Sequence, residues 1–266
     1  MHGLLDGKVA VITGAGSGVG RAATLFFTEQ GARVIAADIN FANAEETAAM
    51  ARAQGGDARA VECNVASQET VDAAVAAAVA VYGRLDIIYN NAGITVSSMP
   101  GRGLRALTEL PNDEMYRVED VNINGVIFGC QAAIRQFEAQ GGGGAIVNTA
   151  SVSGLIGYGG VLYGATKGAV VALTRTLAIE LAAKNIRVNA VCPAGMLTNY
   201  GDLDPNSPHA DKIKERMGMA HPLGRAIEPR DTAAAAAFLA SDLASNITGV
   251  NLPVDGGLTA GRKVGG

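Results

Sequence analysis

Short apolar runs alternate with longer, Ala-rich segments along the chain. The apolar runs are rich in Val and Ile, and their apolar positions are consecutive apart from polar residues near the ends. They lie at residues 9–12, 34–37, 85–89, 145–150 and 186–191. Consecutive apolar residues are typical of strands buried on both faces of a parallel sheet. The intervening segments have helical length and lie at residues 42–54, 67–81 and 168–184. This alternation predicts βαβ units and an α/β, doubly wound sheet with helices on both faces.

No low-complexity linker divides the chain, and its one glycine run, Gly141–Gly144, is too short to separate domains. We therefore expect a single domain over residues 1–266. Two segments interrupt the alternation. Residues 95–110 have weak periodicity and are expected to form a surface excursion. Residues 196–225 contain three prolines and three methionines. Long loops of this kind are usually lids or binding loops, so this segment is expected to cover a substrate; the alternative is a variable surface insertion.

Composition excludes several classes of protein. Hydrophobic residues make up 48% of the chain, and 21 basic residues stand against 25 acidic ones, a net charge of −4. The basic residues are scattered, which argues against a nucleic-acid partner. No apolar run reaches the roughly 18 residues needed to cross a membrane, and the first residues do not resemble a signal peptide. Cys63, Cys130 and Cys192 are too widely spaced for a zinc site or a disulfide framework. We expect a reduced, cytoplasmic protein without a metal.

A glycine-rich turn follows the first apolar run and precedes a helical segment. It reads Thr13–Gly20, with the spacing G-x-x-x-G-x-G at Gly14, Gly18 and Gly20 rather than the strict G-x-G-x-x-G. Glycines allow the backbone to turn sharply and to approach a pyrophosphate at a helix N-terminus. The expected cofactor contacts in this loop are Gly14, Gly16, Ser17, Gly18 and Val19.

Asp38 ends the second predicted strand, 24 positions after Gly14. A carboxylate at that place accepts hydrogen bonds from both adenosine ribose hydroxyls and repels a 2′-phosphate. Ser17 and Ile39, which flank the same place, are not basic. The sequence therefore predicts NAD rather than NADP, with Ile39 as a further cofactor contact. The alternative is that Asp38 only caps a turn.

Tyr163 and Lys167 are four residues apart at the start of a predicted helix that continues to Leu181. Residues with this spacing lie on the same helical face. A free tyrosine has a pKa near 10 and is a poor base at neutral pH. A cation at about 4 Å stabilises phenolate by roughly 4 kcal/mol before desolvation is subtracted. We therefore expect Lys167 to lower the pKa of Tyr163 by up to about three pH units, into the range of a general acid/base.

Besides the Tyr163/Lys167 pair, polar residues stand at the ends of two predicted strands and inside one predicted helix. Ser151 ends the strand predicted at 145–150, Asn90–Gly93 closes the strand at 85–89, and Asn122 falls inside a predicted helix. With the Thr13–Gly20 loop, Pro193–Thr198 and the closing Val254–Gly257, the chain resembles the short-chain dehydrogenase/reductase family. The resemblance covers residues 7 to about 259, in the short, single-domain form. It implies a Rossmann sheet of about seven strands.

The resemblance also implies roles for individual residues. Tyr163 would exchange a proton with the substrate oxygen while hydride moves to or from the nicotinamide. Lys167 would lower the Tyr163 pKa and bind the nicotinamide ribose, Ser151 would orient the substrate oxygen, and Asn122 would hold a water that relays the proton. The further cofactor contacts that it implies are Asn64, Val65, Asn91, Ala92, Gly93, Pro193, Gly195, Met196 and Thr198. Asn64 stands where the family usually has Asp, and Pro193-Ala194-Gly195 replaces the usual Pro-Gly.

The resulting hypothesis is an NAD-dependent alcohol dehydrogenase or ketone reductase acting on a secondary alcohol, with a hydrophobic or alicyclic substrate. The residues expected to line its pocket are Ile94, Val152, Ser153, Tyr158, Met196 and Tyr200. His209 and His221 are expected to be surface or structurally satisfied histidines. The alternatives are a 3-oxoacyl-carrier-protein reductase, which usually prefers NADP, and a non-catalytic NAD-sensing protein. Ala165, Ala169 and Ala172 form a small-residue helical face, and the resemblance implies a homotetramer, with a dimer as the alternative.

Overall fold

The computed structural model describes residues 3–96, 104–200 and 203–261. At its centre is a parallel sheet with the strand order β3-β2-β1-β4-β5-β6-β7. The strands are β1 (Val9–Thr13), β2 (Arg33–Asp38), β3 (Asp57–Glu62), β4 (Ile87–Asn90), β5 (Gly144–Thr149), β6 (Ile186–Pro193) and β7 (Asn251–Val254). The chain reverses its direction across the sheet between β1 and β4, and ligands of doubly wound folds bind at the carboxyl ends of the strands there. The predicted fold class is confirmed.

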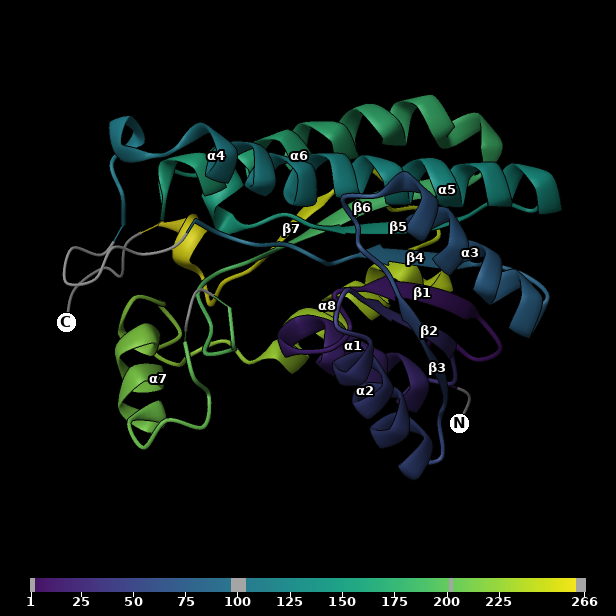
Figure 1. Cartoon of the computed structure of the whole chain (residues 1–266), viewed down its shortest axis with the longest axis horizontal. Helices are drawn as coiled ribbons and strands as arrows, with labels where there is room; N and C mark the ends of the chain where they lie inside the picture. Colours follow the sequence, from purple (N-terminus) through teal and green to yellow (C-terminus); the bar gives the residue numbers. More distant parts are fainter. Residues whose placement is uncertain (1–2, 97–103, 201–202, 262–266) are drawn as a thin grey trace.

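Helices cover both faces of the sheet (Figure 1). One face carries α1 (Gly18–Glu29), α2 (Phe41–Ala53) and α8 (Pro229–Ala240); the other carries α3 (Gln68–Tyr82), α5 (Gly125–Gln140) and α6 (Val161–Leu181). The short α4 (Asn112–Glu119) leads into α5 through a π-helical turn at Asp120–Asn124. The remaining helix, α7 (Ala210–Met219), stands apart from both layers and lies in the segment expected to form a lid.

The sequence pattern found the central strands and missed the edge strands. Every residue of β1 is buried, whereas β3 is mostly half-exposed and β7 contains Pro253, which an edge position tolerates. Neither edge strand therefore produces a continuous apolar run. Two predicted boundaries also shift. The strand predicted from Leu85 begins at Ile87; just before it, the Asp86 carboxylate accepts a hydrogen bond from the Val9 backbone N–H at 2.9 Å. The helix predicted to start at Tyr163 begins at Val161; it ends at Leu181, three residues before the end of the helical segment 168–184.

Alternate residues of each central strand enter two separate cores. In β1, Val9 and Val11 pack in the core under α3, α5 and α6, whereas Ala10 and Ile12 pack in the core under α1 and α8. Both faces of the strand are therefore removed from water, which explains why its sequence has no polar alternation.

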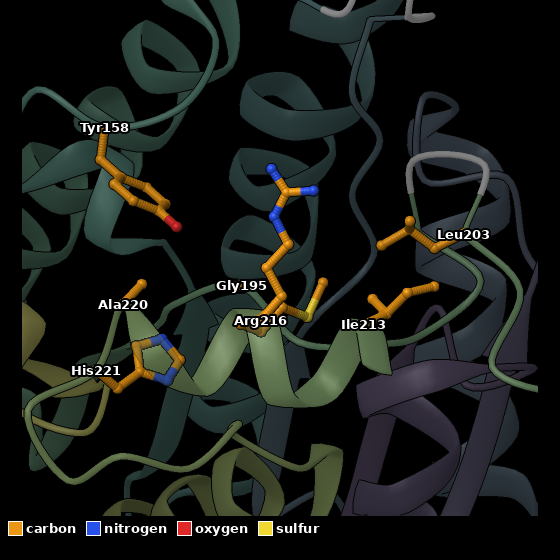
Figure 2. Close-up of a pocket in the computed structure, with 8 residues that line it drawn as sticks. Tyr158, Gly195, Leu203, Ile213, Arg216, Ala220 and His221 are labelled. Atoms are coloured by element: carbon orange, nitrogen blue, oxygen red, sulfur yellow. The ribbon is translucent and has the colours of Figure 1, made fainter. Parts of the chain in front are cut away.

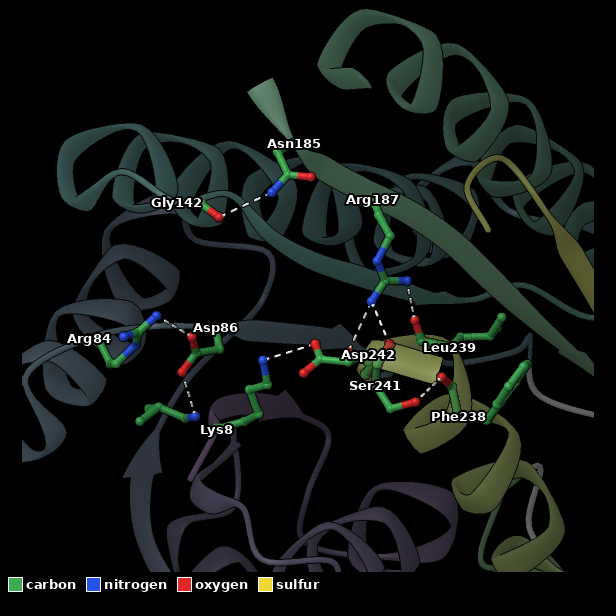
Figure 3. A network of polar contacts seen from close by, with 12 residues as sticks. Lys8, Arg84, Asp86, Gly142, Asn185, Arg187, Phe238, Leu239, Ser241 and Asp242 are labelled. Atoms are coloured by element: carbon green, nitrogen blue, oxygen red, sulfur yellow. Dashed lines mark hydrogen bonds and ion pairs between the residues drawn. The ribbon is translucent and has the colours of Figure 1, made fainter. Parts of the chain in front are cut away.

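The amino-terminal edge of the sheet is closed by polar contacts (Figure 3). The Arg187 guanidinium, at the start of β6, donates to the carbonyls of Leu239, Ala240 and Ser241 at the end of α8, at 2.6, 3.0 and 3.0 Å. Lys8 forms an ion pair with Asp242 at 3.0 Å. These contacts complement the partial negative charge of the helix C-terminus and leave the opposite, carboxyl edge of the sheet for ligands. Within the described residues, no helix combines the length and apolar character needed to cross a membrane.

Candidate active site

The loop between β1 and α1 is built on glycines that cannot be replaced without a clash. Gly14 has φ +66°, and a Cβ there would lie 2.8 Å from the Cα of Ala92. A Cβ on Gly20 would lie 2.0 Å from the Gly14 carbonyl oxygen. These contacts hold the first turn of α1 against the loop and leave the backbone open to a ligand at the helix N-terminus. This open backbone at a helix N-terminus is the place where the sequence predicts a pyrophosphate, and its chemistry suits an anion.

The Asp38 carboxylate lies beside this loop at the end of β2. Its two oxygens accept hydrogen bonds from the backbone N–H groups of Gly16, at 2.8 Å, and Asn40, at 2.9 Å. Ile39, next to it, is 65% exposed. The carboxylate therefore faces the loop where an adenosine ribose would lie.

A basic residue near the same place escaped the sequence interpretation. The Arg21 guanidinium donates to the Gly16 carbonyl at 2.8 Å and to the Thr47 hydroxyl at 3.0 Å. It also forms an ion pair with Glu46. Nothing in the spacing of the glycine-rich loop shows that Arg21, in the first turn of α1, reaches back to it.

The end of β4 forms the floor of the site. The backbone N–H groups of Asn91 and Ala92 donate to the Thr13 hydroxyl at 3.0 and 3.1 Å, and the Asn91 side chain donates to the Thr13 carbonyl at 3.0 Å. A Cβ on Gly93 would lie 3.3 Å from Lys167 Nζ and 3.4 Å from Asn122 Oδ1. Gly93 therefore brings the backbone close to two of the predicted catalytic side chains.

Asn122 sits in the π-helical turn between α4 and α5, where sequence reasoning expected an ordinary helix. Its side chain accepts from the Ile94 N–H and donates to the Ile94 carbonyl, both at 2.8 Å, and donates to the Thr166 hydroxyl at 3.1 Å. Its side chain is fully buried. Single π turns inside α-helices occur frequently at functional sites. Asn122 thus links the segment after β4 to α6.

Ser151 and Lys167 lie past the carboxyl end of β5. The Ser151 hydroxyl accepts from the Ser153 N–H at 3.1 Å and lies 3.4 Å from the Pro193 carbonyl, to which it donates. Lys167 Nζ donates to the Thr149 carbonyl at 2.7 Å. Burial of this ammonium lowers its pKa to about 8. Lys167 is thus a buried cation held at the carboxyl edge of the sheet.

The pKa shift expected for Tyr163 is corrected by the structure. Partial burial raises the pKa of the Tyr163 phenol above its ordinary value, and the hydroxyls of Tyr200 and Ser151 act in the opposite direction. Lys167 Nζ lies 5.6 Å from the centre of the Tyr163 ring and is bound to the Thr149 carbonyl. At that separation the cation does not overcome the desolvation of the phenol.

The loop after β6 joins the catalytic side to the glycine-rich loop. The Tyr200 and Tyr163 rings have centroids 5.9 Å apart, with their planes at 58°. The Tyr200 N–H donates to the Thr198 hydroxyl at 3.2 Å. A Cβ on Gly18 would lie 3.4 Å from the Cβ of Thr198. Thr198 is thus placed over the loop, next to the position expected for the pyrophosphate.

Two predicted cofactor contacts, Asn64 and Val65, follow the end of β3. Asn64 Oδ1 accepts from the Ala66 N–H at 3.1 Å, which leaves one lone pair on that oxygen. Val65 is buried and packs at Gly125, where an added Cβ would lie 2.9 Å from its Cγ2. Val65 therefore has a packing role whatever it contributes to a cofactor.

A cavity of about 380 Å³ opens between α7 and the segments around Tyr158 and Gly195 (Figure 2). It is lined by Tyr158, Gly195, Leu203, Ile213, Arg216, Met217, Ala220 and His221. Six of these residues fall in the segment 196–225, and none of the six was predicted as a site residue. The sequence carries one sign of the helix that bears some of them: Ile213 and Met217 are an apolar pair four residues apart among charged residues, a pattern typical of an amphipathic helix.

The residues that the sequence predicts to line the pocket lie in different surroundings. Tyr158 lines the cavity, whereas Val152 is fully buried and packs with Ala194 and Ile227. Met196 packs partly buried against the same cluster. Ile94 packs with Val96, Val118 and Leu162 and is held by Asn122, and Ser153 holds Ser151.

The two histidines differ in their surroundings. His221 is buried, and its Nδ1 lies 3.0 Å from the Arg225 carbonyl oxygen, so it is a satisfied histidine as predicted. His209 is exposed at the start of α7. Among the described residues there is no group of three or more His, Cys, Asp or Glu side chains that could hold a metal ion.

Comparison with known proteins identifies the family. The family model described as "Enoyl-(Acyl carrier protein) reductase" matches residues 14–259. The chain is 41% identical over 262 residues to 3beta-hydroxysteroid dehydrogenase 2 of Eggerthella lenta, covering 97% of this chain and 96% of that protein. It is 41% identical over 256 residues to meso-2,3-butanediol dehydrogenase of Serratia marcescens, covering 96% of both. A crystal structure of a short-chain type dehydrogenase/reductase from Mycobacterium marinum superimposes with a TM-score of 0.85 at 34% identity, covering 97% of each chain.

The chain belongs to the short-chain dehydrogenase/reductase family. It is an alcohol dehydrogenase/reductase of this family, whose members use NAD or NADP. These relatives carry names with very different substrates, a steroid and a four-carbon diol. Family membership therefore fixes the reaction class and leaves the substrate to be argued from the cavity.

Proposed function

We propose that this short-chain dehydrogenase/reductase interconverts a secondary alcohol and a ketone with NAD, using Tyr163 as the general acid/base. The observation that carries the proposal is the gathering of four polar side chains at the carboxyl edge of the sheet. Gly93 lies beside Lys167 and Asn122, and the Tyr163 phenol interacts with the Ser151 hydroxyl. A bound NAD would accept the hydride from the carbinol carbon of the alcohol.

Each side chain then has a distinct task. Tyr163 takes the hydroxyl proton of the alcohol, or returns it to a ketone. Ser151, fixed by the Ser153 N–H, orients the substrate oxygen and stabilises its developing charge. Lys167 supplies a buried positive charge that favours the phenolate of Tyr163, and it is the residue that would bind the nicotinamide ribose. Asn122 positions the Ile94 segment and keeps one lone pair on Oδ1 for a proton-relaying water.

The preference for NAD over NADP rests on charge around Asp38. Its carboxylate is held by two backbone N–H groups and repels a 2′-phosphate. The nearest candidate to neutralise such a phosphate is Arg21, whose guanidinium is already engaged by Glu46, Thr47 and the Gly16 carbonyl. These contacts favour NAD. They also argue against the alternative of a 3-oxoacyl-carrier-protein reductase, which usually prefers NADP.

A hydrophobic or alicyclic substrate suits the cavity under α7. Leu203, Ile213, Met217 and Ala220 give it an apolar wall, and its volume of about 380 Å³ is within the range of small-molecule sites. The segment 196–225 is proposed as the lid over that substrate. For the assembled protein we propose a homotetramer, with the exposed Ala165 and Ala172 of α6 at a helix interface. Sedimentation as a monomer at micromolar concentration would contradict it.

The test is reduction of the cofactor by a panel of secondary alcohols, followed as NADH formation from NAD and as NADPH formation from NADP. Wild-type enzyme is compared with Tyr163→Phe and with Tyr116→Phe, an exposed tyrosine on α4. We expect turnover with NAD in the wild type and in Tyr116→Phe, and a loss of at least about 1,000-fold in Tyr163→Phe. Tight NADH binding without turnover of any alcohol would favour the NAD-sensing alternative. Equal use of NADP would contradict the role of Asp38.

A further inference from the structure

The cavity under α7 carries a positive charge without a negative counterpart. Of its eight lining residues, the ionisable ones are Arg216, His221 and Tyr158, and none is Asp or Glu. The His221 Nδ1 lies 3.0 Å from the Arg225 carbonyl oxygen, and arginine is the one lining residue type whose charge is fixed at any working pH. Arg216 is therefore the cation of the cavity.

Lys214 and Arg216, two cations of α7, differ in whether they form an ion pair within the described residues. The Lys214 ammonium forms an ion pair with Glu228 at 2.8 Å. No hydrogen bond or ion pair engages the Arg216 guanidinium among residues 3–96, 104–200 and 203–261. Figure 2 shows its side chain extending from α7 so that the guanidinium lies between Tyr158 and Leu203. Glu215, which precedes Arg216 in the chain, does not line this cavity. It lines a second cavity of about 320 Å³, together with Arg216 and Lys212.

The far wall of the cavity adjoins the catalytic side chains. Gly195 follows Pro193 by two residues, and the Pro193 carbonyl accepts from the Ser151 hydroxyl at 3.4 Å. The Tyr158 hydroxyl lies 3.7 Å from the position that a Cβ on Gly195 would take. Gly195 therefore connects this cavity to the Ser151 side of the site, so a ligand with its oxygen at Ser151 would extend toward the apolar wall and Arg216.

We propose that the substrate is an alicyclic secondary alcohol that carries a carboxylate, and that Arg216 recognises this carboxylate. The inference rests on the proposed function and adds the specificity-determining residue. A guanidinium matches a carboxylate with two parallel hydrogen bonds, which a neutral group of similar shape does not offer. The apolar wall would contact the ring of such a substrate, and the Arg216 guanidinium would bind its carboxylate.

The kinetic test uses matched substrates. 4-Hydroxycyclohexane-1-carboxylate and its acetate and propionate homologues, which vary the distance between hydroxyl and charge, are each compared with the corresponding carboxamide. For at least one chain length, we expect the kcat/KM of the carboxylate to exceed that of the carboxamide about ten-fold. This factor is at the lower end of what a hydrogen bond to a charged group contributes, because Arg216 is exposed to solvent. Arg216→Gln should remove this preference, bringing the ratio of the carboxylate to the carboxamide kcat/KM to about one. Lys214→Gln, which removes a charge from the same helix, should retain it.

A binding measurement keeps the inference separate from the proposed activity. Calorimetric titration of cyclohexanecarboxylate into the enzyme–NADH complex should give a Kd about ten-fold weaker in Arg216→Gln than in the wild type and in Lys214→Gln. Alcohol turnover without a carboxylate preference at any length would overturn the inference and leave the proposed function standing. If no alcohol is oxidised, the proposed function fails and the titration decides the inference alone. Equal Kd values in wild type and Arg216→Gln would overturn it.

Discussion

Lys167 places a positive charge in the interior, and its removal should change how stability depends on pH. The residue is 2% exposed, and burial lowers its pKa from 10.5 to about 8. Between these two values the unfolded chain holds a proton that the folded chain has lost. The free energy of unfolding therefore rises with pH from about 8 to 10.5 and is lowest where Lys167 is charged in both states.

The size of this effect follows from the pKa values. A lowering of about 2.5 pH units corresponds to about 3 kcal/mol, of which about 2 kcal/mol develops between pH 7 and pH 9.5. Lys167→Met removes the titrating group and nearly conserves volume. It also leaves the Thr149 carbonyl without its 2.7 Å donor, but that loss does not depend on pH. The difference in stability between wild type and variant should therefore shift by about 2 kcal/mol over this range.

The assay is urea unfolding of wild type and Lys167→Met at pH 7 and pH 9.5, at one protein concentration. Lys212→Met, which removes an exposed lysine of α7, controls for the loss of a charge alone. On raising the pH, the wild type should gain about 2 kcal/mol relative to Lys167→Met. The Lys212→Met variant should follow the wild type. A relative change under about 0.5 kcal/mol, or one of opposite sign, would refute the desolvated-lysine account.

Three further predictions address the cofactor, the proton and the loop. Asp38→Ala should improve kcat/KM with NADP relative to NAD by at least about ten-fold, since repulsion of the 2′-phosphate and the ribose hydrogen bonds are lost together; an unchanged ratio would contradict it. Tyr200→Phe should move the rising limb of the alcohol-oxidation pH profile to higher pH by about 0.5 to 1 unit, because the Tyr200 hydroxyl lowers the Tyr163 pKa; a shift to lower pH would refute it. Gly20→Ala should destabilise the protein in thermal unfolding by about 2 to 4 kcal/mol, because its Cβ would lie 2.0 Å from the Gly14 carbonyl oxygen. Gly168→Ala, with no atom within 4 Å of the added Cβ, should not.

The sequence predicted the central sheet because its strands are buried on both faces. β1 sends alternate residues into two cores, so its apolar run is continuous and easily read. The edge strands β3 and β7 are partly exposed and give no such run. For the same reason α7, which lies outside both layers, was expected as a loop rather than a helix.

Sequence motifs predicted which residues gather at the candidate site. They did not predict the properties that depend on how side chains pack around those residues. Lys167, Asn122 and Gly93 meet as their motifs imply. The direction of the Tyr163 pKa was wrong, because the cost of desolvation depends on surroundings that spacing alone does not reveal. Val152 illustrates the same point, since its neighbours in the chain gave no sign that its side chain turns into a core cluster.

Transfer of a labelled hydride tests the central claim most directly. The alcohol turned over best in the panel is prepared with deuterium on its carbinol carbon and incubated with NAD and enzyme. The reduced cofactor is then analysed by mass spectrometry, and NADH binding to each variant is followed by fluorescence. The account predicts one deuterium in the NADH formed by the wild type, and no labelled NADH above background with Tyr163→Phe despite unchanged NADH binding. Unlabelled NADH from the wild type, or equal labelling by Tyr163→Phe, would contradict it.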